Sequence, residues 1–265
     1  MGIPAARVLG HERRELLPTI FMLERGELSK PTSRSTPALP ATLATATGVK
    51  REISGPYGSR KQLALWLTRE DHPLTARVMV NRLWQWHFGR GIVATPNDFG
   101  AMGSGPTHPK LLDWLATEFV EKGWSIKQMH RLIMNSSVYR QASDFATPEH
   151  LEKDPANRLL WRMNRRRLEA EAIWDAVHAT AGTLNLQLGG RPVVPPLPAD
   201  EIAALRDRWH WPVSADPSQH TRRGMYILVR RNFPFPMFEV FDAPVTSASC
   251  PARDVTTVAP GALDP

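Results

Sequence analysis

Cysteine is almost missing from this 265-residue chain, which contains only Cys250. One cysteine excludes a disulfide within the chain, a CxxCH haem attachment and a zinc site built from several cysteines. Tyrosine is scarce as well, with three residues against nine tryptophans. A single cysteine is compatible with a reducing compartment and with an exported protein that uses few disulfides, so it does not decide the location.

Long apolar runs are also missing, because no stretch approaches the ~18 consecutive apolar residues that a membrane-spanning helix needs. The opening MGIPAARVLGHERREL lacks the basic region and the following apolar region of a signal peptide. We therefore expect no transmembrane segment and no export signal in the chain as given.

The common catalytic signatures do not occur. The sequence contains no GxSxG, HExxH, P-loop or GxGxxG motif, and no order of residues supports a Ser-His-Asp triad. Glu171, Asp175 and His178 share one face of a predicted helix, which could bind a metal but is more typical of a solvated face. We expect no metal and no cofactor in this chain.

Negative charge is in deficit, with 33 Lys+Arg against 26 Asp+Glu and a pI of about 10.0. A basic protein can bind nucleic acid, anionic polysaccharide or a membrane surface. The chain lacks the aromatic-basic signature of a known nucleic-acid module. We therefore do not expect a nucleic-acid partner.

What is present predicts a mainly α fold, with a core of about five helices, long extended or irregular flanking segments and one or two short strand pairs. Residues 1–58 are predicted to form an extended arm and a Pro/Ser/Thr-rich connector. Residues 59–182 form the helical core. Residues 183–265, rich in proline, are predicted to be irregular with a short strand near 222–231, all within one composite domain.

Helix boundaries follow from capping residues. Helices are predicted to begin near Ser59, near Asp71 as N-cap, at Thr107 as N-cap with Pro109 in the first turn, and at Ser125 as N-cap. The second helix is predicted to end at Gly89, and a fifth helix at Gly182.

The second predicted helix, residues 74–88, carries a polar stripe. Apolar residues point in almost every direction, which predicts a central, buried helix, yet Arg77, Asn81 and Gln85 fall on one line four residues apart. Buried polar groups need partners. In one interpretation, Arg77 and Asn81 bind loop carbonyls or a carboxylate such as Asp98 or Asp113. In the other, the stripe lines a cleft in which Arg77 binds a carboxylate, sulfate or phosphate.

Two further residues complete the candidate ligand-binding set. His108 lies in GSGPTHPKLLDW at a predicted helix start, and Arg140 follows the fourth helix. The candidates are therefore Arg77, Asn81, Gln85, Asp98, His108 and Arg140. No residue is predicted to be catalytic.

Three blocks, NRLWQWHFGRGIV, THPKLLDWLA and HRLIMNSSVYRQ, resemble planctomycete-specific domain one, known as domain of unknown function 1553. The resemblance runs from about Arg25 and covers nearly the whole chain. It implies a large exported protein, an extracytoplasmic or periplasmic location, and often an upstream region with a CxxCH motif. Haem c is thus expected only in an upstream domain that this chain does not contain. The family has no established activity, so the resemblance assigns no catalytic residue.

Family members usually continue beyond VTTVAP into a further helical segment, whereas this chain ends in GALDP, which resembles a C-terminal truncation. Three functions stay open. The first is a non-catalytic binding or scaffold domain of a cytochrome-linked protein. The second is an enzyme or accessory domain that acts on anionic, sulfated polysaccharide. The third is a domain that docks a c-type cytochrome. Convergence of Arg77, Asn81 and Asp98 in an open pocket would favour a ligand site, and enclosure with full pairing would favour a scaffold.

Overall fold

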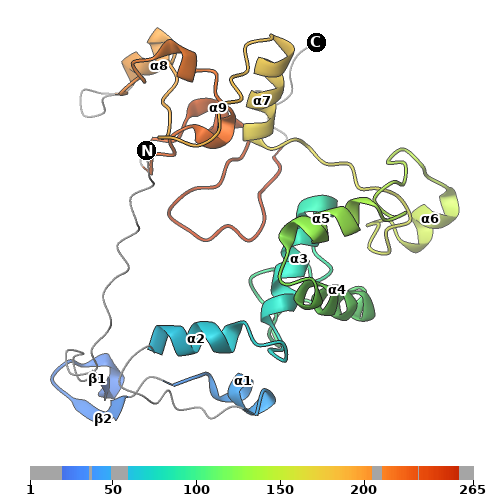
Figure 1. Cartoon of the computed structure of the whole chain (residues 1–265), viewed down its shortest axis with the longest axis vertical. Helices are drawn as coiled ribbons and strands as arrows, with labels where there is room; N and C mark the ends of the chain where they lie inside the picture. The colour runs from blue at the N-terminus through green and yellow to red at the C-terminus, as the bar shows by residue number, and fades with distance from the viewer. Residues whose placement is uncertain (1–19, 36–37, 49–58, 205–210, 232, 257–265) are drawn as a thin grey trace. The chain divides into compact units, whose positions relative to one another are not determined.

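The chain forms two compact units. The computed structural model describes residues 20–35, 38–48, 59–204, 211–231 and 233–256 (Figure 1). Contacts divide the chain into a first unit, Met1–Met163, and a second unit, Asn164–Pro265. The predicted mainly α fold is confirmed, because the described residues contain five helices of seven or more residues and one two-stranded sheet. In these ranges no helix has both the length and the apolarity needed to cross a membrane.

A small hairpin opens the described part of the first unit. Strand β1, Ile20–Leu23, pairs antiparallel with β2, Pro31–Ser35, with an irregularity in register between Phe21 and Leu23. The turn between them contains the 3-10 helix η2, Glu24–Gly26. The hairpin agrees with the predicted presence of one or two short strand pairs, although the sequence did not place a pair in residues 1–58.

A first pair of helices follows the hairpin. Helix α1, Ala41–Ala46, forms inside the predicted connector, and α2, Ser59–Leu67, begins where predicted. Trp66 of α2 is 5% exposed and packs with Leu39 and Ala44 in a small apolar cluster. Its indole Nε1 donates a hydrogen bond to Thr47 Oγ1 at 3.3 Å. The predicted connector is therefore partly helical, and it contributes Leu39 and Ala44 to this apolar cluster.

Helix α3, Thr75–Phe88, starts later than its predicted cap. The prediction of Asp71 as N-cap is wrong, because its carboxylate binds Arg69 at 2.6 Å. Instead, His72 Nδ1 accepts hydrogen bonds from the backbone N–H groups of Leu74 and Thr75, at 3.3 and 3.1 Å. A helix that begins at Thr75 puts its first free N–H groups within reach of residue 72.

The main core of the first unit lies where α3 packs on α4, Pro109–Glu121, and α5, Ile126–Met134. Val80, Leu83 and Met129 are completely buried there. Full burial of such a side chain stabilises the fold by about 1.5–3 kcal/mol. Gly89 ends α3 with a φ of 81° and donates to Gln85 O at 2.7 Å, which confirms the predicted C-terminal glycine.

Of the two N-caps predicted for α4 and α5, one is wrong and the other is confirmed. The prediction of Thr107 as N-cap of α4 is wrong, because the helix begins at Pro109 and has no side-chain cap. Thr107 instead contacts the preceding loop, where its backbone N–H donates a hydrogen bond to Ile92 O at 2.9 Å. The cap at Ser125 is confirmed, since its Oγ accepts from the Gln128 N–H at 3.4 Å.

The first unit ends in a short aromatic segment around α6, Pro148–Lys153. His150 stacks on Trp161 with ring centroids 5.1 Å apart, and Phe145 meets His150 edge-on. The guanidinium of Arg162 lies 4.7 Å from the centre of the Trp161 ring. These contacts give the segment a small packed cluster of its own.

The second unit contains α7, Ala170–Thr180, α8, Ala199–Ala204, and α9, Pro236–Val240, with the 3-10 helices η3, Pro217–Gln219, and η4, Gly224–Tyr226. Helix α7 was grouped with the helical core 59–182, but the contacts place it in this second unit. Among the residues that the structure describes, its core contains eight that are buried, namely Ala170, Val193, Val194, Leu197, Trp211, Ile227, Phe235 and Phe238. The unit therefore has its own hydrophobic core.

The strand predicted near 222–231 does not form. The segment contains η4 and two isolated parallel bridges, Asn185 with Arg222 and Val193 with Ile227. Gly224 explains the break, since a Cβ at this position would lie 2.8 Å from the Glu171 backbone. The chain turns tightly against α7 there, which interrupts the alternation of a strand.

Candidate functional site

Asn81 fastens the loop after α3. Its side chain is completely buried, and Nδ2 donates to Val93 O at 3.0 Å while Oδ1 accepts from Val93 N at 2.8 Å. Gly91 gives the amide its space, because a Cβ there would lie 2.6 Å from Asn81 Nδ2. Asn81 thus makes the loop-carbonyl bond that the structural interpretation requires.

Arg77 joins α3 to α4. Its Nε donates to Asp113 Oδ1 at 2.7 Å, and its NH1 group donates to Pro73 O at 2.6 Å. The side chains of Arg77 and Asp113 are 38% and 58% exposed. An ion pair this exposed contributes only about 0–1 kcal/mol. The guanidinium is therefore engaged but still accessible from solvent.

The loop that follows holds itself in shape. Asp98 Oδ1 accepts from the Gly100 N–H at 2.8 Å, and Thr95 Oγ1 donates to Asp98 O at 2.7 Å. Gly103 approaches so closely that a Cβ there would lie 2.1 Å from Asp98 O. Asp98 therefore has a local role in the loop rather than a contact with Arg77.

A cleft of about 280 Å³ lies between this loop and the two helices. Arg77 and Asp113 line it together with Leu74, Val93, Phe99, Gly100, Gly103, Ser104, Gly105, Pro106, Pro109 and Leu112. Of the six predicted site residues, Arg77 is the one among these lining residues. The volume of the cleft is just below the usual range of small-molecule pockets, about 300–1,000 Å³.

The remaining three predicted residues lie elsewhere. Gln85 is buried in α3, and its carbonyl closes the helix at Gly89. His108 Nδ1 lies 2.9 Å from Thr107 Oγ1, and Arg140 donates to Asn135 O at 3.1 Å beyond the end of α5. The structure thus brings Arg77 to a cleft but does not gather the six residues into one site.

The imidazoles of His87 in α3 and His130 in α5 lie in contact, a pair that the sequence did not predict. His87 Nε2 lies 2.8 Å from His130 Nδ1, and Tyr139 meets the His87 ring edge-on. Both histidines are half-buried. The two histidines are 43 residues apart in the sequence, so no local motif could have predicted their contact.

On α7, the three candidate metal ligands have other partners. Asp175 accepts from Arg223 Nε at 3.0 Å, and His178 Nδ1 lies 2.9 Å from Thr183 Oγ1. Glu171 forms a two-pronged ion pair with Arg253, at 2.6 and 3.0 Å. Within the described part of the chain, no group of three or more His, Cys, Asp or Glu could hold a metal ion.

The partner of Glu171, Arg253, lies far along the chain. Burial opposes ionisation of Glu171, but the Arg253 guanidinium outweighs it and lowers the pKa of this carboxyl. The same bond raises the pKa of Arg253. Arg167 binds Asp242. These pairings join residues 75 to 82 positions apart, beyond the range of helical periodicity.

A second cavity, of about 700 Å³, lies inside the second unit and was not predicted. The lining consists of Glu171 and residues 228–231, 234, 235, 238, 239, 242–246 and 248–254. No single one of these segments has a binding motif. The sequence offered only a weak signal, the clustering of proline and phenylalanine in PFPMFEVFDAP.

A family model described as a protein of unknown function, DUF1553 (PSD1), matches residues 59–264. The chain belongs to the DUF1553 family. Both units of this DUF1553 chain contribute to the match, which confirms the resemblance carried by the three sequence blocks. Neither a curated protein nor a solved structure matches the chain.

Proposed function

We propose that this DUF1553 chain is a non-catalytic binding domain of an exported, cytochrome-linked protein. The cleft beside α3 and α4 carries the proposal. Its loop is held rigidly by Asn81 and by the Thr95–Asp98 bonds, while the Arg77–Asp113 pair stays accessible at its wall. A rigid loop beside an accessible guanidinium is suited to recognition rather than to bond making.

The extracytoplasmic location belongs to the same proposal and has its own test. Expression of the full reading frame in its native cell, followed by fractionation, should recover the protein outside the cytoplasm. Recovery in the cytoplasmic fraction would contradict this part of the proposal.

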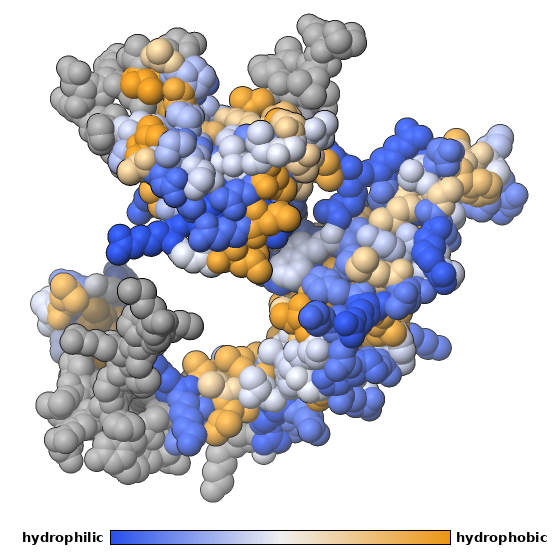
Figure 2. All heavy atoms as spheres, turned by 45° about the horizontal axis from the view of Figure 1, so that its top comes forward, coloured by the Kyte–Doolittle hydropathy of each residue, from blue (hydrophilic) through white to orange (hydrophobic). Residues whose placement is uncertain are grey.

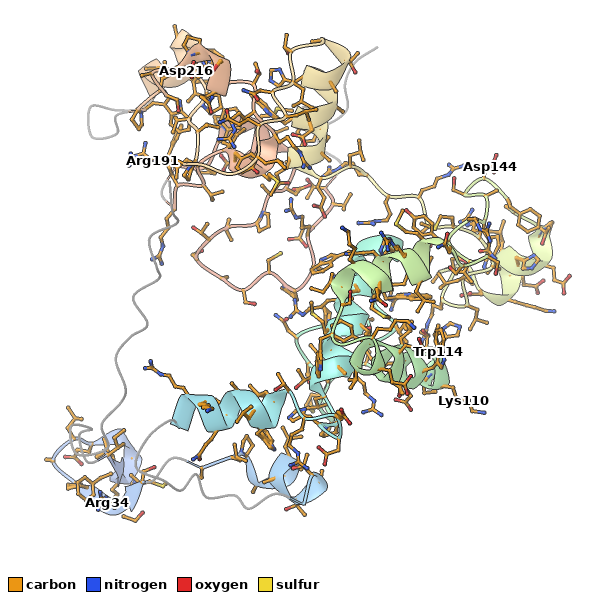
Figure 3. The ribbon with its side chains drawn as sticks, viewed as in Figure 1. Arg34, Lys110, Trp114, Asp144, Arg191 and Asp216 are labelled. Atoms are coloured by element: carbon orange, nitrogen blue, oxygen red, sulfur yellow. The ribbon has the colours of Figure 1, made fainter. Side chains whose placement is uncertain are left out.

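Sulfated polysaccharide is the ligand class that one further observation favours. Lys110 and Trp114 project from α4 one helical turn apart, and the Trp114 side chain is 48% exposed (Figure 3). An exposed indole can stack on a sugar ring, and lysine and arginine can bind sulfate groups. Asp113, which holds Arg77, lies between these two residues in sequence.

A glycan array with matched variants tests this ligand class. Arg77→Ala should weaken binding to sulfated glycans about tenfold or more, because it removes a guanidinium from the cleft. Arg140→Ala is the matched control, since it removes an exposed arginine that does not line the cleft. Equal losses in both variants would indicate attraction by net charge alone. No salt-sensitive binding to any sulfated glycan would exclude this ligand class.

Docking of a c-type cytochrome is the other candidate, and it rests on the net charge of +7. A basic surface can steer an acidic partner into an encounter. Titration with a c-type haem domain should then give a complex at low ionic strength that dissociates as salt increases. Absence of a complex at low ionic strength would exclude docking.

A further inference from the structure

The cavity of the second unit has a rigid apolar floor. Phe235 and Phe238 line it and are only 6% and 4% exposed, because they also belong to the core. Trp174 packs edge-on against Phe235, with ring centroids 5.4 Å apart, and Trp211 stacks on it at 6.3 Å. Leu228 completes the floor. The shape of the floor is therefore fixed by core packing.

The opposite wall is a strap of small residues, which we define as residues 243–252. Most of the strap lines the cavity, including Ala248, Cys250 and Ala252, and it contains no helix or strand. Because its side chains are small, they leave the space above the phenylalanines open. The resulting volume of about 700 Å³ lies within the usual range of small-molecule sites, about 300–1,000 Å³.

The strap is anchored at both ends. Before it, the Asp242 carboxylate binds Arg167 and accepts hydrogen bonds from Thr256 N and Oγ1, at 2.9 and 2.8 Å. The Thr256 backbone and the Arg167 side chain lower the pKa of Asp242 to about 2. After it, Arg253 binds Glu171 at 2.6 and 3.0 Å. The anchors keep the strap in one place relative to the floor.

The charges around the cavity do not call for a charged ligand. Three charged residues of the lining, Glu171, Asp242 and Arg253, are half-buried and already form ion pairs. Glu171 pairs with Arg253, and Asp242 pairs with Arg167, which does not line the cavity. Half-buried Arg230 lies with its guanidinium 6.0 Å from the Trp211 ring. The other charged lining residues, Arg231, Glu239 and Asp254, are exposed and of both signs.

Two exposed residues of the cavity lining are apolar as well. Val229 and Val245 line it and remain 57% and 67% exposed. Exposed apolar residues that line a concave apolar site favour binding of an apolar group. Over the visible face of the molecule as a whole, hydrophobic and hydrophilic groups lie next to one another (Figure 2).

We propose that this cavity binds an uncharged, mainly apolar molecule, such as a fused aromatic ring system or an acyl chain, beneath the strap. The floor supplies hydrophobic contact, and the anchored strap supplies a fixed wall against which the ligand rests. This site lies wholly within the second unit and does not depend on the cleft in the first unit, so either can fail without the other.

The neutral dye N-phenyl-1-naphthylamine, which fluoresces in apolar surroundings, tests the proposal on the whole chain. We expect saturable binding of one dye per chain, unchanged between low and high salt. Ala248→Trp and Ala252→Trp place an indole in the cavity and should each weaken binding about tenfold or more. Ala179→Trp, on an exposed part of α7 that does not line the cavity, should leave binding unchanged.

The unmodified protein provides a second measurement that does not depend on folding of a variant. Cys250 lines the cavity and is the sole cysteine, so bound dye should slow its alkylation by iodoacetamide several-fold. Unchanged alkylation at saturating dye, or equal binding by both strap variants and the control, would overturn the proposal. Salt-sensitive binding of anionic anilinonaphthalene sulfonate with none of the neutral dye would overturn the assignment to an uncharged ligand.

Discussion

Replacement of Asn81 by alanine should destabilise the first unit strongly. The change leaves the N–H and C=O of Val93 without their partners, and Val93 is only 3% exposed. Each buried backbone group left unsatisfied costs about 1–3 kcal/mol. Because the loop can move and admit water, we expect a total loss of about 2–4 kcal/mol. Native proteins have about 5–15 kcal/mol of stability, so the variant should still fold.

Urea unfolding followed by circular dichroism measures this loss as a lower midpoint at an unchanged slope. Hydrogen exchange at the Val93 amide should accelerate in parallel. Arg140→Ala is a suitable control, because a surface change of this kind stays within about 0.5 kcal/mol. A loss below about 1 kcal/mol in Asn81→Ala would refute the argument that the two bonds hold the loop.

Asn81→Asp sharpens the same test through pH. A neutral carboxylic acid can both accept from Val93 N and donate to Val93 O, whereas the carboxylate can only accept. Burial also raises the pKa of a carboxyl at this position. The stability of the variant relative to the parent should therefore be greatest below about pH 3.9, the ordinary pKa of aspartic acid, and should fall as pH rises through the raised pKa of the buried carboxyl. A variant whose stability relative to the parent does not depend on pH would contradict this reasoning.

Three further outcomes are expected. Burial lowers the pKa of His72, so the part of the stability that its neutral ring provides should be complete above about pH 6.5 and lost as pH falls below that value. Thermal melts across this range should show the loss. His72→Asn, whose amide oxygen can still accept from the first N–H groups of α3, should remove this dependence on pH. Gly103→Ala should destabilise by about 1–3 kcal/mol, because its Cβ meets Asp98 O, whereas Gly105→Ala meets nothing within 4 Å and should be nearly neutral in urea unfolding. Ser125→Ala should cost about 1 kcal/mol in the same assay through loss of the α5 cap, and no change would show that the cap is dispensable.

Periodicity predicted the five longer helices, α2, α3, α4, α5 and α7, and local chemistry predicted some of their ends. Gly89 and Ser125 act as predicted because a left-handed turn and a capping hydroxyl depend on residues within a few positions. Asp71 and Thr107 fail as caps because each found a better partner, Arg69 in one case and Ile92 in the other. The boundary of a helix is therefore less predictable than its existence.

The polar stripe was informative about structure. A buried asparagine in an apolar helix must find partners, and a loop carbonyl was among those considered for Asn81. Asp113 was likewise considered for Arg77. The cavity under the strap could not be predicted, because separated irregular segments surround it and pairs such as Glu171–Arg253 join residues 82 positions apart.

The amide of Asn81 behaves towards Val93 as a neighbouring β-strand would, offering one donor and one acceptor at peptide-like spacing. Few side chains can replace it, since aspartate lacks the donor, leucine lacks both groups, and glutamine is longer in a site already closed by Gly91. A library of variants selected only for folding should therefore keep asparagine at this position. Invariance at residue 81 would then report the architecture of the loop, and a search for ligand-binding residues should give it no weight.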